Sequence, residues 1–328
     1  MLVPFPELQE DFRSFRAGVK SLPIRLKSSR GTLKRIAQSW QLYVLILPAI
    51  VYIFLFNYEP MYGVQIAFRD FRINRGITGS PWAGLKHFAR FVQYPDFWNI
   101  MRNTAVISLY SFATFPISIL FALFLNELTS ERYKKTVQMI TYMPHFISMV
   151  VICEMIDIFF GRSDGFVNNI LELLGHERVA FLESGRYFAS VYVWSDVWQE
   201  MGWGAIIYIA ALANVSPELI EAARIDGANR VQIIWHVNIP TILPTVIIML
   251  ILRCGGILAV GFEKTYLLQN PLNLDASQVI ATYTYKIGLL NAEYSYSAAV
   301  GLFNTIINVG FLLAVNAIAK RVSEVSIW

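Results

Sequence analysis

Six long apolar stretches constrain this chain of 328 residues more than any other feature of its sequence. Three of them contain no Asp, Glu, Lys or Arg, and they cover residues 36–58, 103–126 and 294–319. A helix of roughly 20 mostly apolar residues crosses a bilayer core, so each stretch is long enough to span it. Only 15% of the chain is charged, against about 25% in soluble domains, which argues against the buried helices of a soluble protein. The sequence predicts an all-α, polytopic membrane protein with six transmembrane helices.

The other three stretches carry ionisable residues, which are costly inside a bilayer and mark a functional or structural role. They are 136–160 with Glu154 and Asp157, 187–213 with Asp196 and Glu200, and 240–262 with Arg253. Arg253 lies about 20 Å along a helix from Pro240, in the outer half of the membrane, where it needs compensation. Two alternatives stay open: an internal pair with one of these four acids, or a negatively charged ligand.

The distribution of Lys and Arg predicts the orientation, because cytoplasmic loops carry the excess of these residues. Of 27 basic residues, 15 fall in the segments 1–41, 127–136, 214–238 and 320–328, and 11 fall in 59–102, 161–186 and 263–293. We therefore expect both termini in the cytoplasm. The predicted domains are a basic N-terminal segment 1–41, a transmembrane domain 42–320 containing the loop 214–240, and a cytoplasmic tail 321–328.

The N-terminal segment shows no cleavable signal peptide, because about forty residues precede the first apolar run. Residues 7–22 form an amphipathic, basic pattern. We expect either a helix on the anionic surface of the membrane lipid or a solvated basic tail.

Catalytic and metal-binding motifs are not found. Cys153 and Cys254 both fall in predicted spans and indicate neither a disulfide nor a metal framework. The G-x-S-x-G pattern at 161–165 has neither the strand-to-helix context nor the partners of a hydrolase nucleophile. No G-x-x-x-x-G-K-[ST] occurs, so nucleotide hydrolysis must come from another chain. The pI of about 9.0 reflects the cytoplasmic basic residues and is not taken as a sign of nucleic-acid binding.

The loop between the fourth and fifth predicted spans holds a helix-turn-helix pattern. Ser216 can cap a helix that starts at Pro217, and Gly227 can take the left-handed conformation that ends it. Glu221 with Arg224, and Asp226 with Arg230, are spaced to form ion pairs. The helix leaves a small-residue surface that another protein can approach closely.

This loop resembles the EAA loop of binding-protein-dependent ABC importer permeases of type I. The matching residues are Glu221, Ala222, Ala223, Asp226, Gly227, Ile239 and Pro240, with Ile239 where leucine is usual. The resemblance implies a cytoplasmic coupling helix that sits in a cleft of the ATPase and transmits nucleotide-driven movement to the spans.

Further segments resemble the branch of that family that imports oligo- and polysaccharides, and within it the permeases of alginate-oligosaccharide importers. They are 58–63, 144–148, 202–204, 261–263 and 294–301. The resemblance implies the bacterial inner membrane and three partners: a second permease in a heterodimer, a cytoplasmic ATPase dimer that binds ATP and Mg, and a periplasmic or extracellular substrate-binding protein. No cofactor is expected in this chain itself.

The candidate residues of the translocation path are Glu200, Arg253, Asp196 and Trp198. Trp198 shares a helix face with Trp194, and the two acids share another. In one interpretation these tryptophans and acids line a sugar path. In the other, Trp194 belongs to the interfacial aromatic belt and the acids pair with neighbouring helices. Two other classes of function remain as alternatives: a membrane-embedded enzyme, which lacks a paired catalytic motif here, and an ion-coupled carrier, which commonly has repeated halves.

Overall fold

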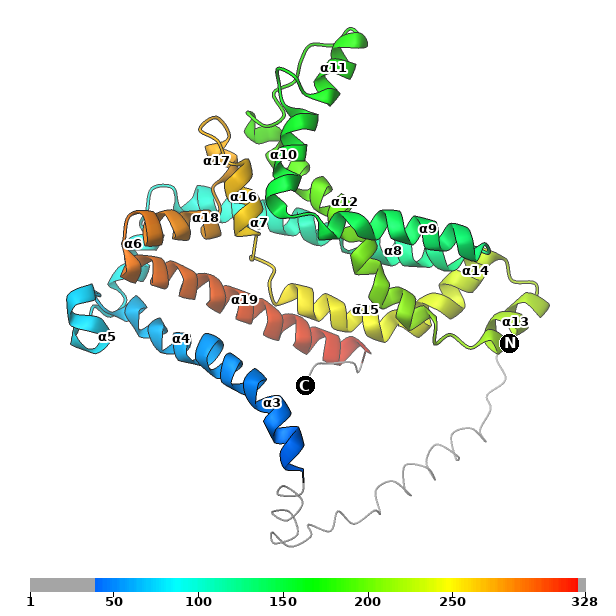
Figure 1. Cartoon of the computed structure of the whole chain (residues 1–328), viewed down its shortest axis with the longest axis horizontal. Coiled ribbons are helices and arrows are strands. Elements are labelled where there is room, and N and C mark those ends of the chain that lie inside the picture. The colour runs from blue at the N-terminus through cyan, green and yellow to red at the C-terminus, as the bar shows by residue number, and fades with distance from the viewer. Residues whose placement is uncertain (1–38, 324–328) are drawn as a thin grey trace, which may run out of the picture. The chain divides into compact units, whose positions relative to one another are not determined.

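The computed structural model describes residues 39–323, so the predictions for the N-terminal segment and most of the tail lie outside the described residues. The chain divides into two compact units, up to Gly63 and from Val64 onward. The first unit contains α3 (Trp40–Ile53), the π-helical turn η1 (Phe54–Tyr58) and α4 (Glu59–Met61), coloured blue in Figure 1. The helix runs on into η2 (Tyr62–Phe68), and the continuous stretch 40–68 is long and apolar enough to cross a membrane.

The second unit contains the other predicted spans. Three helical stretches pass the same test of length and hydropathy. They are α7 (Phe97–Ala113) with α8 (Phe115–Asn126); α14 (Arg230–Ile233), η5 (Ile234–Asn238) and α15 (Ile239–Cys254); and α19 (Tyr294–Ser323). If each of two further bent helix pairs counts as one span, the described residues contain six spans rather than four. This agrees with the predicted all-α architecture of six spans.

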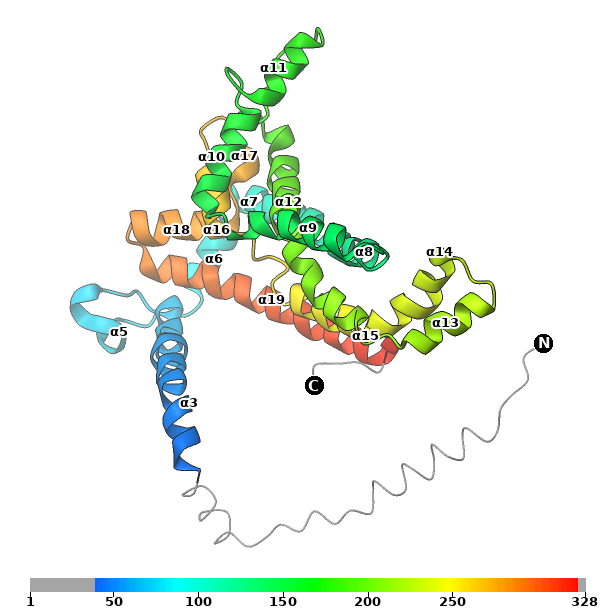
Figure 2. The same ribbon diagram turned by 45° about the vertical axis from the view of Figure 1, so that its right-hand side comes forward.

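The third predicted span is not straight. It consists of α9 (Glu131–Tyr142), the 3₁₀ turn η4 (Met143–Phe146) and α10 (Met149–Phe160), and its two arms meet at 103°. Ile147 and Ser148 have extended backbones between the arms, and Ser148 caps α10 by accepting a hydrogen bond from the Val151 N–H. Both views show α10 turning away from α9 (Figure 2).

The fourth span is α12 (Gly185–Leu212), which is bent by 79° against α13 (Pro217–Ile225) of the loop that follows. The fifth span is shorter than predicted, because α15 ends at Cys254 rather than near residue 262. The two glycines that follow Cys254 have low helix propensity and account for this end.

The connecting segments of the second unit are helical turns and short helices. They are η3 (Ile73–Arg75), α5 (Gly76–Gly79), α6 (Lys86–Val92), α11 (Phe166–Leu173), α16 (Phe262–Leu268), α17 (Leu274–Ser277), α18 (Ile280–Tyr285) and the π turn η6 (Lys286–Leu290).

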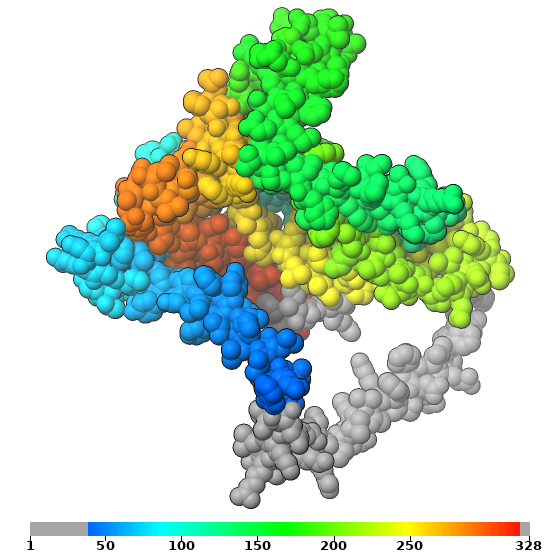
Figure 3. Space-filling model, in the orientation of Figure 1, coloured from blue at the N-terminus to red at the C-terminus, as the bar shows by residue number. Residues whose placement is uncertain are grey.

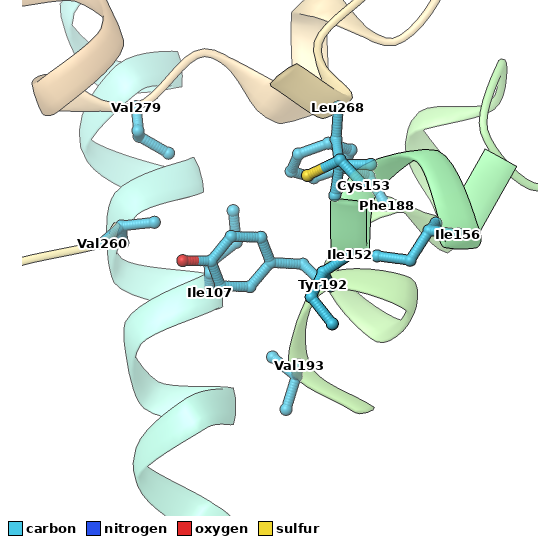
Figure 4. Close-up of a cluster of buried hydrophobic side chains, with 10 residues drawn as sticks. All are labelled: Ile107, Ile152, Cys153, Ile156, Phe188, Tyr192, Val193, Val260, Leu268 and Val279. Atoms are coloured by element: carbon cyan, nitrogen blue, oxygen red, sulfur yellow. The ribbon is translucent and has the colours of Figure 1, made fainter. Parts of the chain in front are cut away.

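A cluster of ten buried side chains joins α7, α10, α12 and α16 and fixes the walls of the site described below. Tyr192 lies within this cluster (Figure 4). Its hydroxyl accepts a hydrogen bond from the Gly261 N–H at 3.1 Å. A second cluster packs α6 and α18 against α7 and α19, and a third packs α8 against α12 and α15. The space-filling view shows a hollow where the yellow chain around α15 meets the green helices (Figure 3).

Candidate translocation site and coupling loop

A cavity of about 460 Å³ brings together residues of α7, α12, α15 and α16. A neighbouring cavity of about 310 Å³ shares four of its lining residues: Ser111, Asp196, Glu200 and Arg253. Three of the four predicted path residues therefore face a common polar surface. This surface is made by helices far apart in sequence, because the buried cluster around Tyr192 holds them together.

Arg253 forms no ion pair within the described part of the chain. Its guanidinium donates a hydrogen bond to the Ser111 carbonyl at 2.5 Å and lies 5.8 Å from the centre of the Phe115 ring. The expected alternative of an internal pair with one of the four acids is not observed. Arg253 therefore keeps its charge facing the cavity without a carboxylate partner.

Asp196 pairs instead with Lys264, a residue that the sequence analysis did not single out. The Lys264 ammonium lies 2.6 Å from Asp196 Oδ1 and 3.0 Å from the Tyr192 carbonyl, and its side chain is 1% exposed. The only signal for it in the sequence was a charged residue directly after the 261–263 motif. Glu263, which precedes it, also lines the larger cavity.

Glu200 pairs with His145 of η4. His145 Nδ1 donates to the carboxylate, with distances of 2.9 and 3.1 Å to the two oxygens. The imidazole stacks on Trp203 with 4.2 Å between ring centres and 3° between the planes. One face of α12 thus holds the bend of the third span, since Gln199 also donates to the Ile147 carbonyl at 3.2 Å.

Trp198 does not lie with the charged residues. Together with Trp194 it lines a separate, almost wholly apolar cavity of about 510 Å³ between α10 and α12. The Trp194 indole N–H donates to the Tyr110 hydroxyl at 2.8 Å. Trp198 and the two acids thus line different cavities, which agrees with the two helix faces expected from the sequence.

The predicted helix-turn-helix of the coupling loop is present. The helix α13 begins after Ser216, whose side chain makes no capping hydrogen bond, and Gly227 has a φ of +83°. The Ala228 N–H bonds the Ala223 carbonyl and the Gly227 N–H bonds that of Arg224, which is a Schellman end. Asn229 starts α14 with a capping box to Gln232. The expected pairs Glu221–Arg224 and Asp226–Arg230 are not among the ion pairs of the described residues.

The coupling loop presents an exposed surface with apolar side chains. No residue of α13 is buried, and Ile225 is 86% exposed. Leu219, Val231 and Trp235 are exposed as well. Directly before Pro240 the helix widens into η5, and the Ile239 N–H bonds the Ile234 carbonyl five residues back. Such a turn accommodates Pro240, which lacks an N–H and crowds the carbonyl four residues before it.

The segment before α7 is fixed by ion pairs outside the spans. The Lys86 ammonium lies 3.0 Å from Asp70, and His87 Nε2 lies 3.1 Å from the same carboxyl. The hydrogen bond from Lys86 holds the pKa of Asp70 below its usual value. Arg90 pairs with Glu293 ahead of α19 and stacks on Tyr296, which ties α6 to the last span.

Comparisons with known proteins identify the class. The model of the family "Binding-protein-dependent transport system inner membrane component" matches residues 114–324, and the chain belongs to this family. The chain is 39% identical to the polygalacturonan/rhamnogalacturonan transport system permease YteP of Bacillus subtilis, with 92% of this chain and 94% of YteP covered. It is also 39% identical to the protein LplB of the same organism, with 86% and 89% covered.

Two solved structures are similar as well. One is a bacterial ABC transporter involved in the import of the acidic polysaccharide alginate, with a TM-score of 0.82, 38% identity and coverage of 89% of this chain and 99% of that chain. The other is a bacterial alginate ABC transporter in complex with a periplasmic protein that holds an alginate pentasaccharide, with a TM-score of 0.82, 37% identity and coverage of 90% and 99%. The family consists of transporter permeases, which disfavours the alternatives of an enzyme and a lone carrier.

Proposed function

We propose that this chain is a permease subunit of an ATP-driven importer of acidic oligosaccharides in the bacterial inner membrane, with both termini in the cytoplasm. Family membership supports the permease role, and the relatives whose names refer to polygalacturonan, rhamnogalacturonan and alginate support the class of substrate. The observation that carries the acidic substrate is Arg253, which faces the cavity without a carboxylate partner among the described residues.

The coupling residues Glu221, Ala222, Ala223, Asp226, Gly227, Ile239 and Pro240 are proposed to engage an ATPase dimer that binds ATP and Mg. Support comes from the exposed surface of α13, where Leu219 and Ile225 have no cover within the described residues. A second permease, in a heterodimer, and a substrate-binding protein on the outer side complete the proposed assembly. Purification of the tagged chain from its native membrane tests this. Recovery of the chain without an ATPase and a second permease would contradict it.

The substrate class is tested by substituting Arg253. In a complex reconstituted with its partners, Arg253→Gln should lower uptake of a uronate oligomer about tenfold or more, because a charge-assisted bond of roughly 1.5–3 kcal/mol is lost. Uptake of any neutral sugar that the complex accepts should fall much less. Arg253→Lys keeps the charge and serves as the matched control.

A thermal-stability measurement separates this role from a structural one. If Arg253 faces the substrate, the melting temperature of the Arg253→Gln complex should stay close to that of the wild type. An equal loss of uptake for both classes of sugar, together with a lowered melting temperature, would remove Arg253 from the site.

A further inference from the structure

Glu200 and Arg253 line the same two cavities, yet the carboxylate of Glu200 is bonded elsewhere. Both of its oxygens lie within 3.1 Å of His145 Nδ1. None of the ion pairs in the described part of the chain joins Glu200 to Arg253. The carboxylate of Glu200 is thus held on the His145 side of the cavity wall, and the guanidinium of Arg253 is left facing the cavity.

The position of His145 is set by α12 itself. Trp203 provides the parallel stacking surface, and Phe146 meets the same indole edge-on with 5.5 Å between ring centres. Gly202 lies so close to the bend that a Cβ atom there would be 2.3 Å from the Thr141 carbonyl oxygen. The ring contacts position the imidazole and the close approach at Gly202 fixes the bend that carries it, so that Nδ1 points at Glu200.

A free Glu200 carboxylate would compete with a substrate for Arg253. It belongs to the same molecule, so its effective concentration at the guanidinium is far above that of a sugar arriving from solution. An internal Glu200–Arg253 pair would also neutralise the cation that a carboxylate of the sugar is to meet. Some other group must therefore hold Glu200 if Arg253 is to receive an anionic ligand.

We propose that His145 is this group: a positioning residue that holds the Glu200 carboxylate away from Arg253, so that the guanidinium stays available to a carboxylate of the sugar. The inference rests on the proposed function, because it takes the substrate to be acidic. It assigns to the bend of the third span a role in substrate specificity in addition to its role in packing.

The test is a double-mutant cycle in the reconstituted complex, with uptake of a uronate oligomer as the readout. His145→Phe keeps a ring on Trp203 but removes the donor, and it should lower uptake about fivefold or more in the wild-type background. In the Glu200→Gln background the same substitution should cost less than about twofold, because the competing charge is gone. An equal loss in both backgrounds, or no loss in either, would overturn the proposal.

His145→Asn provides the complementary variant, because its side-chain amide keeps a donor near Nδ1 while the stack on Trp203 is lost. Uptake should be retained better in His145→Asn than in His145→Phe, and the opposite order would show that only the stacking matters. This comparison decides the question if Glu200→Gln alone abolishes uptake.

If His145→Phe does not assemble, uptake by His145→Asn alone decides, and loss of uptake in that variant overturns the proposal. Failure of the proposed function is recognised separately, since the wild-type complex would then take up no uronate oligomer.

Discussion

The Lys264 ammonium lies 2.6 Å from a carboxylate oxygen of Asp196 and joins α16 to α12 in the cavity wall. The two partners differ in burial, with side-chain exposures of 1% for Lys264 and 37% for Asp196. Removing Asp196 and removing Lys264 are therefore expected to change the stability of the protein by different amounts.

We predict that Asp196→Asn destabilises the protein more than Lys264→Met does. The first leaves a buried ammonium without its counter-charge, at a cost of about 3 kcal/mol, whereas the second leaves a carboxylate that cavity water can solvate. The double variant should be more stable than Asp196→Asn alone. Thermal unfolding of the purified complexes measures the order, and equal melting temperatures for the two single variants would contradict it.

Gly202→Ala should destabilise the packing of α12 on α9 by about 2 kcal/mol, because the added Cβ would meet the Thr141 backbone oxygen at 2.3 Å. Gly204→Ala is the matched control on the same helix. Its Cβ would meet the Ser118 hydroxyl at 2.9 Å, and a side chain can rotate away. The difference in melting temperature between the two variants checks this, and a larger drop for Gly204→Ala would show that the close approach is misassigned.

Gly227→Val should uncouple ATP hydrolysis from transport while the protein remains folded in the membrane. The φ of +83° is strained for a β-branched residue, although no atom lies within 4 Å of the added Cβ. The turn itself must therefore move. Gly227→Asn should retain more of the coupled transport, since asparagine tolerates this conformation better than valine does. Normal uptake and sugar-stimulated ATPase activity in Gly227→Val would refute the assignment of the loop.

The permease pair without its binding protein should bind sugar only weakly. The segments outside the spans, including residues 59–102, are expected to dock a soluble binding protein that supplies most of the affinity. Calorimetry on the isolated pair should give a Kd no tighter than roughly 0.1 mM, or about −5.5 kcal/mol. Tight binding in the absence of the binding protein would count against this division of roles.

The spans and the coupling turn could be predicted because their signals are local. Runs of apolar residues mark a helix that lies in lipid, and Gly227 marks a left-handed turn from its residue type alone. The bend at Ile147 and Ser148 could not be predicted in this way, because the contacts that fix its angle come from α12, more than fifty positions further along the chain. The partners of the charged residues were also out of reach, because Lys264 and Asp196 are 68 positions apart and His145 and Glu200 are 55 apart.

The π-helical turn before Pro240 stores one extra residue between the coupling loop and the fifth span. Deleting any one residue of 234–238 would restore the regular α-helical spacing. Because the wider turn takes up this residue within one turn of the backbone, its deletion would leave α14 nearly in the same rotational orientation relative to Arg253. An extra residue inserted into the regular part of α15 has no such turn to take it up, and it would rotate the cavity-lining end at Arg253 by about 100° relative to the loop at the other end of the helix.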